Sequence, residues 1–182
     1  MKKFNGFTLV ELMIAVAIMS ILLAVAAPNF RNIIQNNRLT TNANEMISAF
    51  MVARSEAIKR GVSVQVMSLG GNNWANGWAI VTDEDNDAIF NPMPACGANQ
   101  DCQIQNKEAL DPSLSFRSPA NNAQFFEFDA RGRLRVANSP PNTLVMCDER
   151  NLVPAARAIV ISNTGRVRVL SATDPAANAP NC

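Results

Sequence analysis

The stretch Phe7–Ala27, FTLVELMIAVAIMSILLAVAA, decides how this chain is organised. It contains a single charged residue, Glu11, and as a helix it would extend about 32 Å at roughly 1.5 Å per residue. That length matches the hydrocarbon core of a bilayer. Lys2 and Lys3 precede the run, so the positive-inside bias predicts a cytoplasmic N-terminus and export of the rest of the chain. The run is therefore expected to cross a membrane once.

Glu11 is unusual because a carboxylate inside an apolar span costs on the order of 2.5–3.5 kcal/mol, so it should have a partner or a function. The hexapeptide from Gly6 to Glu11, GFTLVE, follows a short basic leader and resembles the processing site of type IV pilins and type II secretion pseudopilins. The resemblance implies that a membrane peptidase cuts between Gly6 and Phe7 and that Phe7 is then N-methylated. It also implies that Glu11 pairs with the N-terminal ammonium of a neighbouring subunit in a filament, so that both charges are buried together.

An ordinary secretory signal peptide is the alternative interpretation of the N-terminus. Lys2 and Lys3 would form its basic region, and Ala24-Val25-Ala26 resembles a cleavage site. Two features count against it: the apolar run exceeds the usual length of roughly 7–15 residues, and it contains Glu11.

The composition agrees with an exported domain that has no enzymatic centre. A chain of 182 residues allows one domain plus a long helix. Its net charge of +1 provides no general attraction to nucleic acid or acidic lipid. Histidine, the commonest general base and metal ligand, is absent, and neither a Walker nor a G-x-S-x-G motif occurs. We therefore expect neither an enzyme nor a cofactor.

The four cysteines lie beyond the membrane span, where a bacterial periplasm would oxidise them. Four cysteines allow three pairings. We favour Cys96–Cys102, which closes a short loop, and Cys147–Cys182, which fixes the C-terminus. A zinc site is the competing interpretation, but the sequence has no C-x-x-C and no histidine to complete one.

The helical pattern continues beyond the apolar run. Pro28 is expected to bend this helix rather than end it, because such kinks are tolerated in membrane helices. Lys59 and Arg60 form a cationic last turn, and Gly61 follows as a C-terminal glycine. The apolar residues that recur at steps of three or four, as on one face of a helix, are Phe30, Ile33, Ile34, Ala43, Met46, Ile47, Phe50, Ala53, Ala57 and Ile58. We predict a helix from about Phe7 to Arg60.

From Val62 onward the hydrophobic period becomes alternating, which is typical of β-strands. The expected strands are 62–66, 78–82, 123–128, 133–136, 143–147, 158–161 and 166–170. The stretch 96–119 is interpreted as a variable loop. A long helix followed by strands without intervening helices predicts an α+β fold, with an antiparallel sheet packed on the helix.

The part of the chain beyond the membrane span resembles the GspH/FimT branch of type IV pilin-like proteins, with minor pilins of the FimU type as the nearest match. The segments that carry this resemblance are Asn36–Thr40, Ala53–Gly61, Gly77-Trp78 with Asp83, Phe128–Gly132 and Ser162–Val167. With the leader, the resemblance spans nearly the whole chain. Together with the helical and strand patterns it predicts a leader peptide (1–6), a transmembrane and filament-core helix (7–28), an amphipathic helix (29–61) and a β-rich head (62–182).

The segment Asp83–Asp87, DEDND, begins like a calcium-binding loop with acids two residues apart. However, Ala88 stands where an EF-hand loop has glycine, and Pro94 stands where it has a bidentate glutamate. We interpret the segment as a polar hairpin tip and predict no metal site. A weak, incidental cation site remains the alternative.

Two G-R-x-R elements, Gly132–Arg135 and Gly165–Arg168, raise the question of nucleic acid binding. In FimT relatives a G-R-x-R element near the C-terminus is associated with DNA binding during uptake, which makes Arg166 and Arg168, with Arg133 and Arg135, the candidate DNA contacts. Arginines two apart on a strand project from one face and can bind successive phosphates. The same pattern also suits a solvent-facing strand edge, and we favour that structural role.

These features together predict a minor pilin, a low-copy structural subunit that helps to initiate a type IV pilus. Its expected partners are other minor and major pilins, the prepilin peptidase and N-methyltransferase, and the inner membrane. The head would be periplasmic before assembly and exposed on the pilus afterwards. Two alternatives remain open: a FimT-like pilin for DNA uptake, and a GspH-like pseudopilin of type II secretion. The leader does not distinguish pilus from secretion system, but the cysteines favour a filament outside the cell.

Overall fold

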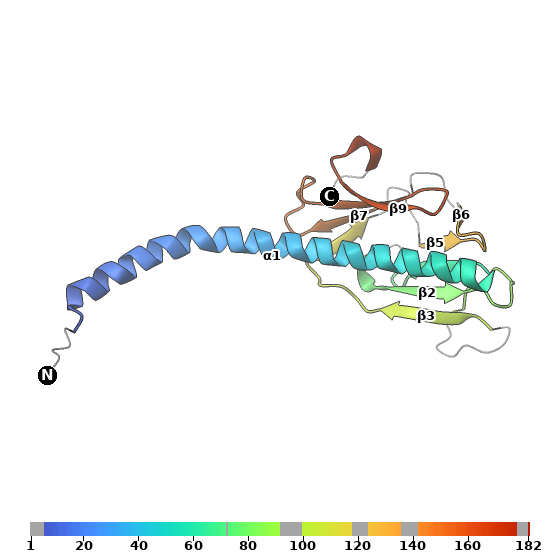
Figure 1. Cartoon of the computed structure of the whole chain (residues 1–182), viewed down its shortest axis with the longest axis horizontal. Helices are drawn as coiled ribbons and strands as arrows, with labels where there is room; N and C mark the ends of the chain where they lie inside the picture. Colours follow the sequence, from blue (N-terminus) through green and yellow to red (C-terminus); the bar gives the residue numbers. More distant parts are fainter. Residues whose placement is uncertain (1–5, 72, 92–99, 118–123, 136–141, 178–181) are drawn as a thin grey trace. The chain divides into compact units, whose positions relative to one another are not determined.

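The computed structural model describes residues 6–71, 73–91, 100–117, 124–135, 142–177 and 182 (Figure 1). The chain divides into two compact units, Met1–Arg38 and Leu39–Cys182, and we call the second one the head unit. One helix, α1 (Leu9–Arg60), contributes to both units. The helix continues through Pro28, as the sequence predicts, and it ends in the cationic turn formed by Lys59 and Arg60.

The N-terminal part of α1 is apolar and exposed. It contains an 18-residue window that has a mean hydropathy of 2.7 and no buried residue. By length and composition, the helix is sufficient to cross a membrane. Phe30, Ile33 and Ile34, which the sequence places on the amphipathic stripe, are exposed as well. The helix in the structure is therefore long and apolar enough to cross a membrane, as the sequence predicts for this segment.

The head unit contains two antiparallel sheets rather than the one that the strand pattern predicts. Sheet A has the order β3 (Cys102–Lys107), β2 (Trp78–Thr82), β1 (Val64–Ser68), β5 (Phe125–Phe128) and β6 (Leu134–Arg135). Sheet B has the order β4 (Leu114–Arg117), β7 (Thr143–Asp148), β8 (Arg157–Ile161) and β9 (Val167–Ser171). Two short 3-10 helices, η1 (Trp74–Asn76) and η2 (Pro175–Ala177), complete the described elements. The α+β class and the antiparallel pairing are confirmed.

The head unit has its main core between α1 and the inner faces of the sheets. The fully buried helix residues are Leu39, Ala43, Met46, Ala49, Phe50, Ala53 and Ala57, which recur at steps of three or four. Five of them belong to the predicted stripe, whereas Leu39 and Ala49 were missed and Ile58 is exposed. Phe50 contacts Phe126 and Phe128 edge to face, with ring centroids 5.3 and 6.4 Å apart. These contacts seat the helix on sheet A.

The prediction of a continuous loop over 96–119 is wrong for two segments, which form β3 and β4. Strand β3 has the sequence CQIQNK, in which polar residues dominate because the strand lies at the edge of sheet A. Strand β4 has only four residues, LSFR, which is too short for its alternation to stand out. In the structure Leu114 and Phe116 of β4 are buried in the core.

Sheet B is covered on both faces, which explains why every residue of β7 is buried. Leu144 and Met146 belong to the main core, and Val145 and Cys147 belong to a second apolar cluster on the opposite face. Thr143 Oγ1 donates a hydrogen bond to the carbonyl of Ala177 at 2.9 Å, which ties the C-terminal segment to this face.

The predicted Cys147–Cys182 disulfide is confirmed, with the two Cα atoms 5.7 Å apart, and it fixes the C-terminal residue to the middle of sheet B. The predicted Cys96–Cys102 disulfide involves Cys96, which lies outside the described residues, and it stays a prediction.

Two glycine turns, one in each sheet, meet at close range. A Cβ atom built on Gly165 would lie 2.1 Å from the carbonyl oxygen of Gly132, and both glycines have positive φ, +76° and +71°. Arg54 Nε of α1 donates to that same carbonyl oxygen at 3.0 Å. The amide of Leu134 also donates to the carbonyl of Asn163 at 3.1 Å. Glycine is therefore required at 165 both for its backbone conformation and for this contact between the sheets.

We expect Gly165→Ala to lower the free energy of unfolding by about 2–5 kcal/mol, because strain at positive φ is added to an overlap with backbone. Gly61→Ala is the matched control, since Gly61 has φ +73° but no atom within 4 Å of a Cβ; it should cost about 1 kcal/mol. Urea unfolding of the full chain in detergent micelles, followed by fluorescence of the buried Trp74 and Trp78, measures both. Equal losses for the two variants would show that the close contact has no energetic consequence.

Candidate functional site

The first candidate site is the N-terminal segment that precedes α1. Gly6 and Phe7 lie before the first helical residue, and Phe7 is 86% exposed. Residues 1–5 of the predicted leader lie outside the described residues. The Gly6–Phe7 bond is therefore in an exposed, non-helical part of the chain, where a peptidase can reach the backbone.

Glu11 and Thr8 form a reciprocal cap at the start of the helix. The Thr8 amide and hydroxyl both donate to Glu11 Oε2, at 3.0 and 2.9 Å, and the Glu11 amide donates to Thr8 Oγ1 at 3.3 Å. This is a capping box, in which the side chains satisfy two orphan amides of the first turn. The T-x-x-E pattern is typical of this cap, whereas the resemblance to pilins implied only a partner in another subunit. In a single chain Glu11 has a local hydrogen-bond partner and lacks an opposite charge among the described residues.

The helix beyond this cap presents apolar side chains around its whole circumference. Leu9, Leu12, Ile14, Ile21 and Leu22 are all more than half exposed. Water-exposed apolar surface of this extent is unfavourable, at roughly 25 cal/mol per Å², unless lipid or protein covers it. The segment therefore requires a membrane or a set of neighbouring helices around it.

The second candidate site comprises the two G-R-x-R elements, whose glycines the fold brings into contact. Arg133 pairs with Asp129 at 2.9 Å and Arg135 pairs with Glu127 at 2.9 Å, so these two guanidinium groups are neutralised locally. Burial acts to raise the pKa of Asp129, but hydrogen bonds from Arg133 outweigh it and hold that pKa below its ordinary value.

Arg166 and Arg168 are exposed and form no ion pair with the described residues. Only one of the two G-R-x-R elements thus presents free positive charge. Two phosphate contacts give only weak, salt-sensitive binding, so the arrangement favours the structural role of these elements over a DNA interface.

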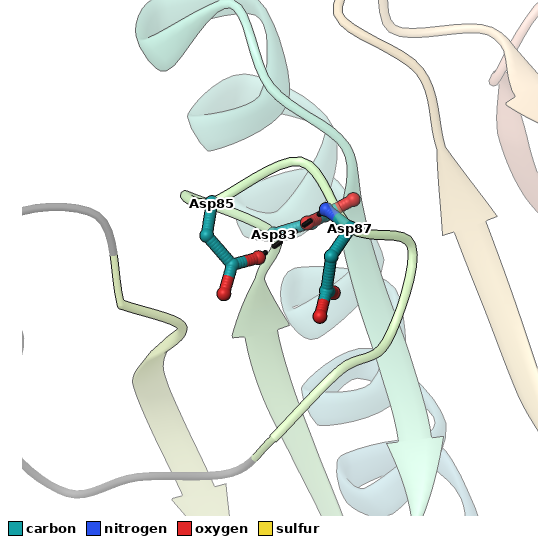
Figure 2. Close-up of side chains that lie close together, drawn as sticks. All are labelled: Asp83, Asp85 and Asp87. Atoms are coloured by element: carbon teal, nitrogen blue, oxygen red, sulfur yellow. Dashed lines mark hydrogen bonds between the residues drawn. The ribbon is translucent and has the colours of Figure 1, made fainter.

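The third candidate site is the aspartate loop after β2. Figure 2 shows Asp83, Asp85 and Asp87 close together, and one ligand oxygen from each lies within 4.8 Å of the others. Asp85 and Asp87 are exposed, whereas Asp83 is only 3% exposed. Burial raises the pKa of Asp83, and the charges of Asp101 and Asp85 raise it further, against a hydrogen bond from the Ala88 amide. The sequence did not indicate Asp101, because it lies far from this loop along the chain and approaches it only through the β2–β3 pairing.

Comparisons with known proteins agree with the N-terminal segment and with the fold. The family model for type II transport protein GspH matches residues 42–165, and the prokaryotic N-terminal methylation motif matches residues 1–27. The pilin-like protein PilA1 of Thermus thermophilus is 31% identical over 170 residues, which are 91% of this chain and 97% of that protein. A fimbrial protein of Pseudomonas aeruginosa is 41% identical over 64 residues, which are 35% of this chain and only 41% of the relative's length.

Two solved structures resemble the chain in fold. The type IV minor pilin FimU of Pseudomonas aeruginosa matches with a TM-score of 0.58 and 20% identity, covering 76% of this chain and 92% of that chain. The minor pseudopilin EpsH of the Vibrio cholerae type 2 secretion system matches with a TM-score of 0.51 and 14% identity, covering 75% and 99%. At these identities the likeness concerns the fold alone, and it is that of a type IV pilin.

The GspH model accounts for most of the head unit and the methylation motif accounts for the segment that holds Gly6, Phe7 and Glu11. The two matches follow each other along the chain in the same order as the apolar helix and the two sheets. The chain therefore belongs to the GspH family of pilin-like proteins and carries the prokaryotic N-terminal methylation motif.

Proposed function

We propose that this protein is a minor pilin, a non-enzymatic structural subunit of a type IV pilus that is present at low copy and helps to initiate the filament. The observation that carries the proposal is the combination of an exposed Gly6–Phe7 bond with an apolar helix that has no cover of its own. A prepilin peptidase would cut this bond and Phe7 would be N-methylated. The segments would then be a leader (1–6), a filament-core helix (7–28), an amphipathic helix (29–61) and a head (62–182).

Glu11 has a different role before and after assembly in this proposal. In a single chain its carboxylate is held by the Thr8 cap, at the exposed start of the helix. When helices pack together, water leaves this region and a lone carboxylate becomes costly. The N-terminal ammonium that cleavage creates on a neighbouring subunit supplies the opposite charge, so cleavage and assembly are linked through Glu11.

A pilus is favoured over a type II secretion system by the disulfide chemistry of the head. Cys147–Cys182 ties the end of the chain to a buried strand. A filament outside the cell gains more from such a covalent constraint than a short periplasmic assembly does. Other minor and major pilins are the expected partners. The head would face the periplasm while the helix sits in the inner membrane, and the cell exterior after assembly.

We expect Glu11→Gln to be processed normally but to enter filaments at least about tenfold less often, because an ammonium buried without its partner costs about 3–5 kcal/mol. Glutamine also serves in a capping box, so this variant keeps the helix start and removes only the charge. Thr8→Val is the matched control, since it removes both hydrogen bonds of the Thr8 hydroxyl, leaves the amide of residue 8 to donate to Glu11, and keeps the charge; it should assemble like the native chain. Quantitative immunoblotting of sheared pili against membranes measures both. If Thr8→Val failed and Glu11→Gln assembled, the cap would be the functional element.

Deletion of the gene is expected to abolish surface pili and twitching motility and to leave exoprotein secretion intact, because the filament would lack an initiating subunit. Electron microscopy of pili, a stab assay for twitching and a secreted-enzyme assay provide the three readouts. A secretion defect with normal pili would assign the protein to a type II secretion system instead. Complementation with the native gene is the control for effects on neighbouring genes.

A further inference from the structure

The carboxylates of Asp83, Asp85 and Asp87 lie together in the loop after β2, and a fourth acid, Asp101, lies next to Asp83 just before β3. Thr82 pairs with Cys102 as the last residue pair of these antiparallel strands, so the residues just beyond it, Asp83 and Asp101, lie next to each other. Thr82 Oγ1 also donates to the Cys102 carbonyl at 3.4 Å. Asp85 and Asp87 extend the group from the loop side (Figure 2).

The two inner carboxylates are buried and incompletely satisfied. Asp83 and Asp101 are each only 3% exposed. One oxygen of each accepts a backbone hydrogen bond: Asp83 Oδ2 from the Ala88 amide at 3.3 Å and Asp101 Oδ2 from the Asn91 amide at 2.6 Å. The second oxygen of each, Oδ1, has no hydrogen-bond partner among the described residues. Two neighbouring buried carboxylates with open oxygens require a positive charge between them or a shared proton.

Arg60, the cationic side chain that pairs with Glu84 in this loop, does not provide that charge. Arg60 is engaged by Glu56 and by Glu84, with both contacts at 2.7 Å. Its guanidinium group thus compensates two other carboxylates, and none of the ion pairs found among the described residues involves Asp83, Asp85, Asp87 or Asp101.

We propose that Asp83, Asp85 and Asp87 form a calcium-binding site in the loop after β2, with Asp101 beside it as a further negative charge. The donors are all carboxylate oxygens, which favours a hard cation over zinc or copper. Two oxygens bound to one Ca²⁺ at 2.3–2.6 Å lie at most about 5 Å apart, and those of Asp83, Asp85 and Asp87 lie within 4.8 Å of one another. The site goes beyond the proposed function, because it needs neither processing nor assembly.

The loop conformation removes one of the objections that the sequence raised. Ala88 occupies the position of the glycine in an EF-hand loop, and its φ of +63° is the left-handed conformation that this glycine normally supplies. The other objection concerned Pro94, which lies outside the described residues. Asp101, just before β3, adds a buried negative charge beside Asp83 that also favours a cation at the group.

The test uses the full chain in detergent micelles, stripped with a chelator and titrated with CaCl₂ by isothermal titration calorimetry. We expect one Ca²⁺ per chain with a Kd between about 10⁻⁵ and 10⁻³ M, and a higher Tm when the ion is bound. MgCl₂ should bind at least about tenfold more weakly, because Mg²⁺ retains its water and rarely takes an all-protein cage. Absence of Ca²⁺ binding at millimolar concentration would overturn the proposal and favour a shared proton between Asp83 and Asp101.

Two variants and one control locate the site. The double variant Asp85→Asn, Asp87→Asn should weaken Ca²⁺ binding at least about tenfold, because two negative charges are lost. The loop should keep its conformation, because an asparagine side chain can still accept the hydrogen bonds that Asp85 accepts from the amide of residue 87 and that Asp87 accepts from the Ile89 amide. Asp101→Asn should weaken it by a smaller factor, because it removes a neighbouring charge rather than a ligand and keeps an acceptor for the Asn91 amide. Glu108→Gln, which removes an exposed acid outside the group, should bind like the native chain. Native affinity in the variant that carries both Asp85→Asn and Asp87→Asn would contradict the assigned ligands.

Discussion

The structure of the head unit depends on the burial of one face of α1, from Leu39 to Ala57. Ala43, Ala53 and Ala57 are buried on this face, and Phe50 packs in the same core. Its ring meets Phe126 and Phe128 of β5, which places sheet A against the helix. Arg54, on the same helix, donates to the Gly132 carbonyl at the point where the turns of the two sheets touch. Without this helical face neither sheet would have a partner for its inner side.

The same helix satisfies two different environments along its length. Within the head unit its buried residues follow the helical period, as expected for a face that packs on a core. In the N-terminal part apolar residues surround the helix, and Leu12, Ile14 and Leu22 are exposed in the single chain. Lipid can cover that surface before assembly, and the helices of other subunits can cover it afterwards. Under the proposed function the two environments differ in kind for Glu11, because packed helices would have to provide a charge where an exposed helix end needs only hydrogen bonds.

The sequence predicted those parts of the structure that follow from local pattern. The apolar run, the apolar stripe and the cationic end with its glycine predicted the helix, and alternating or short apolar runs predicted β1, β2 and β5 to β9. Strand β3 was missed because edge strands tolerate polar residues on both faces, and the division into two sheets was missed because strand partners are not encoded locally. The approach of Asp101 to Asp83 and the contact of Gly165 with Gly132 are likewise products of strand pairing and packing. Each joins residues that are distant in sequence, and neither has a sequence motif.

The mature N-terminus tests the central claim most directly, because processing at Gly6 is what distinguishes a pilin-like subunit from an ordinary exported protein. Mass spectrometry of the native protein, isolated from membranes of cells that express it, should find a first residue of Phe7 that carries one added methyl group. The rest of the apolar run should remain attached to the head. A chain that begins at Ala27, as cleavage by a signal peptidase would produce, would remove the helix on which assembly depends and would contradict the account.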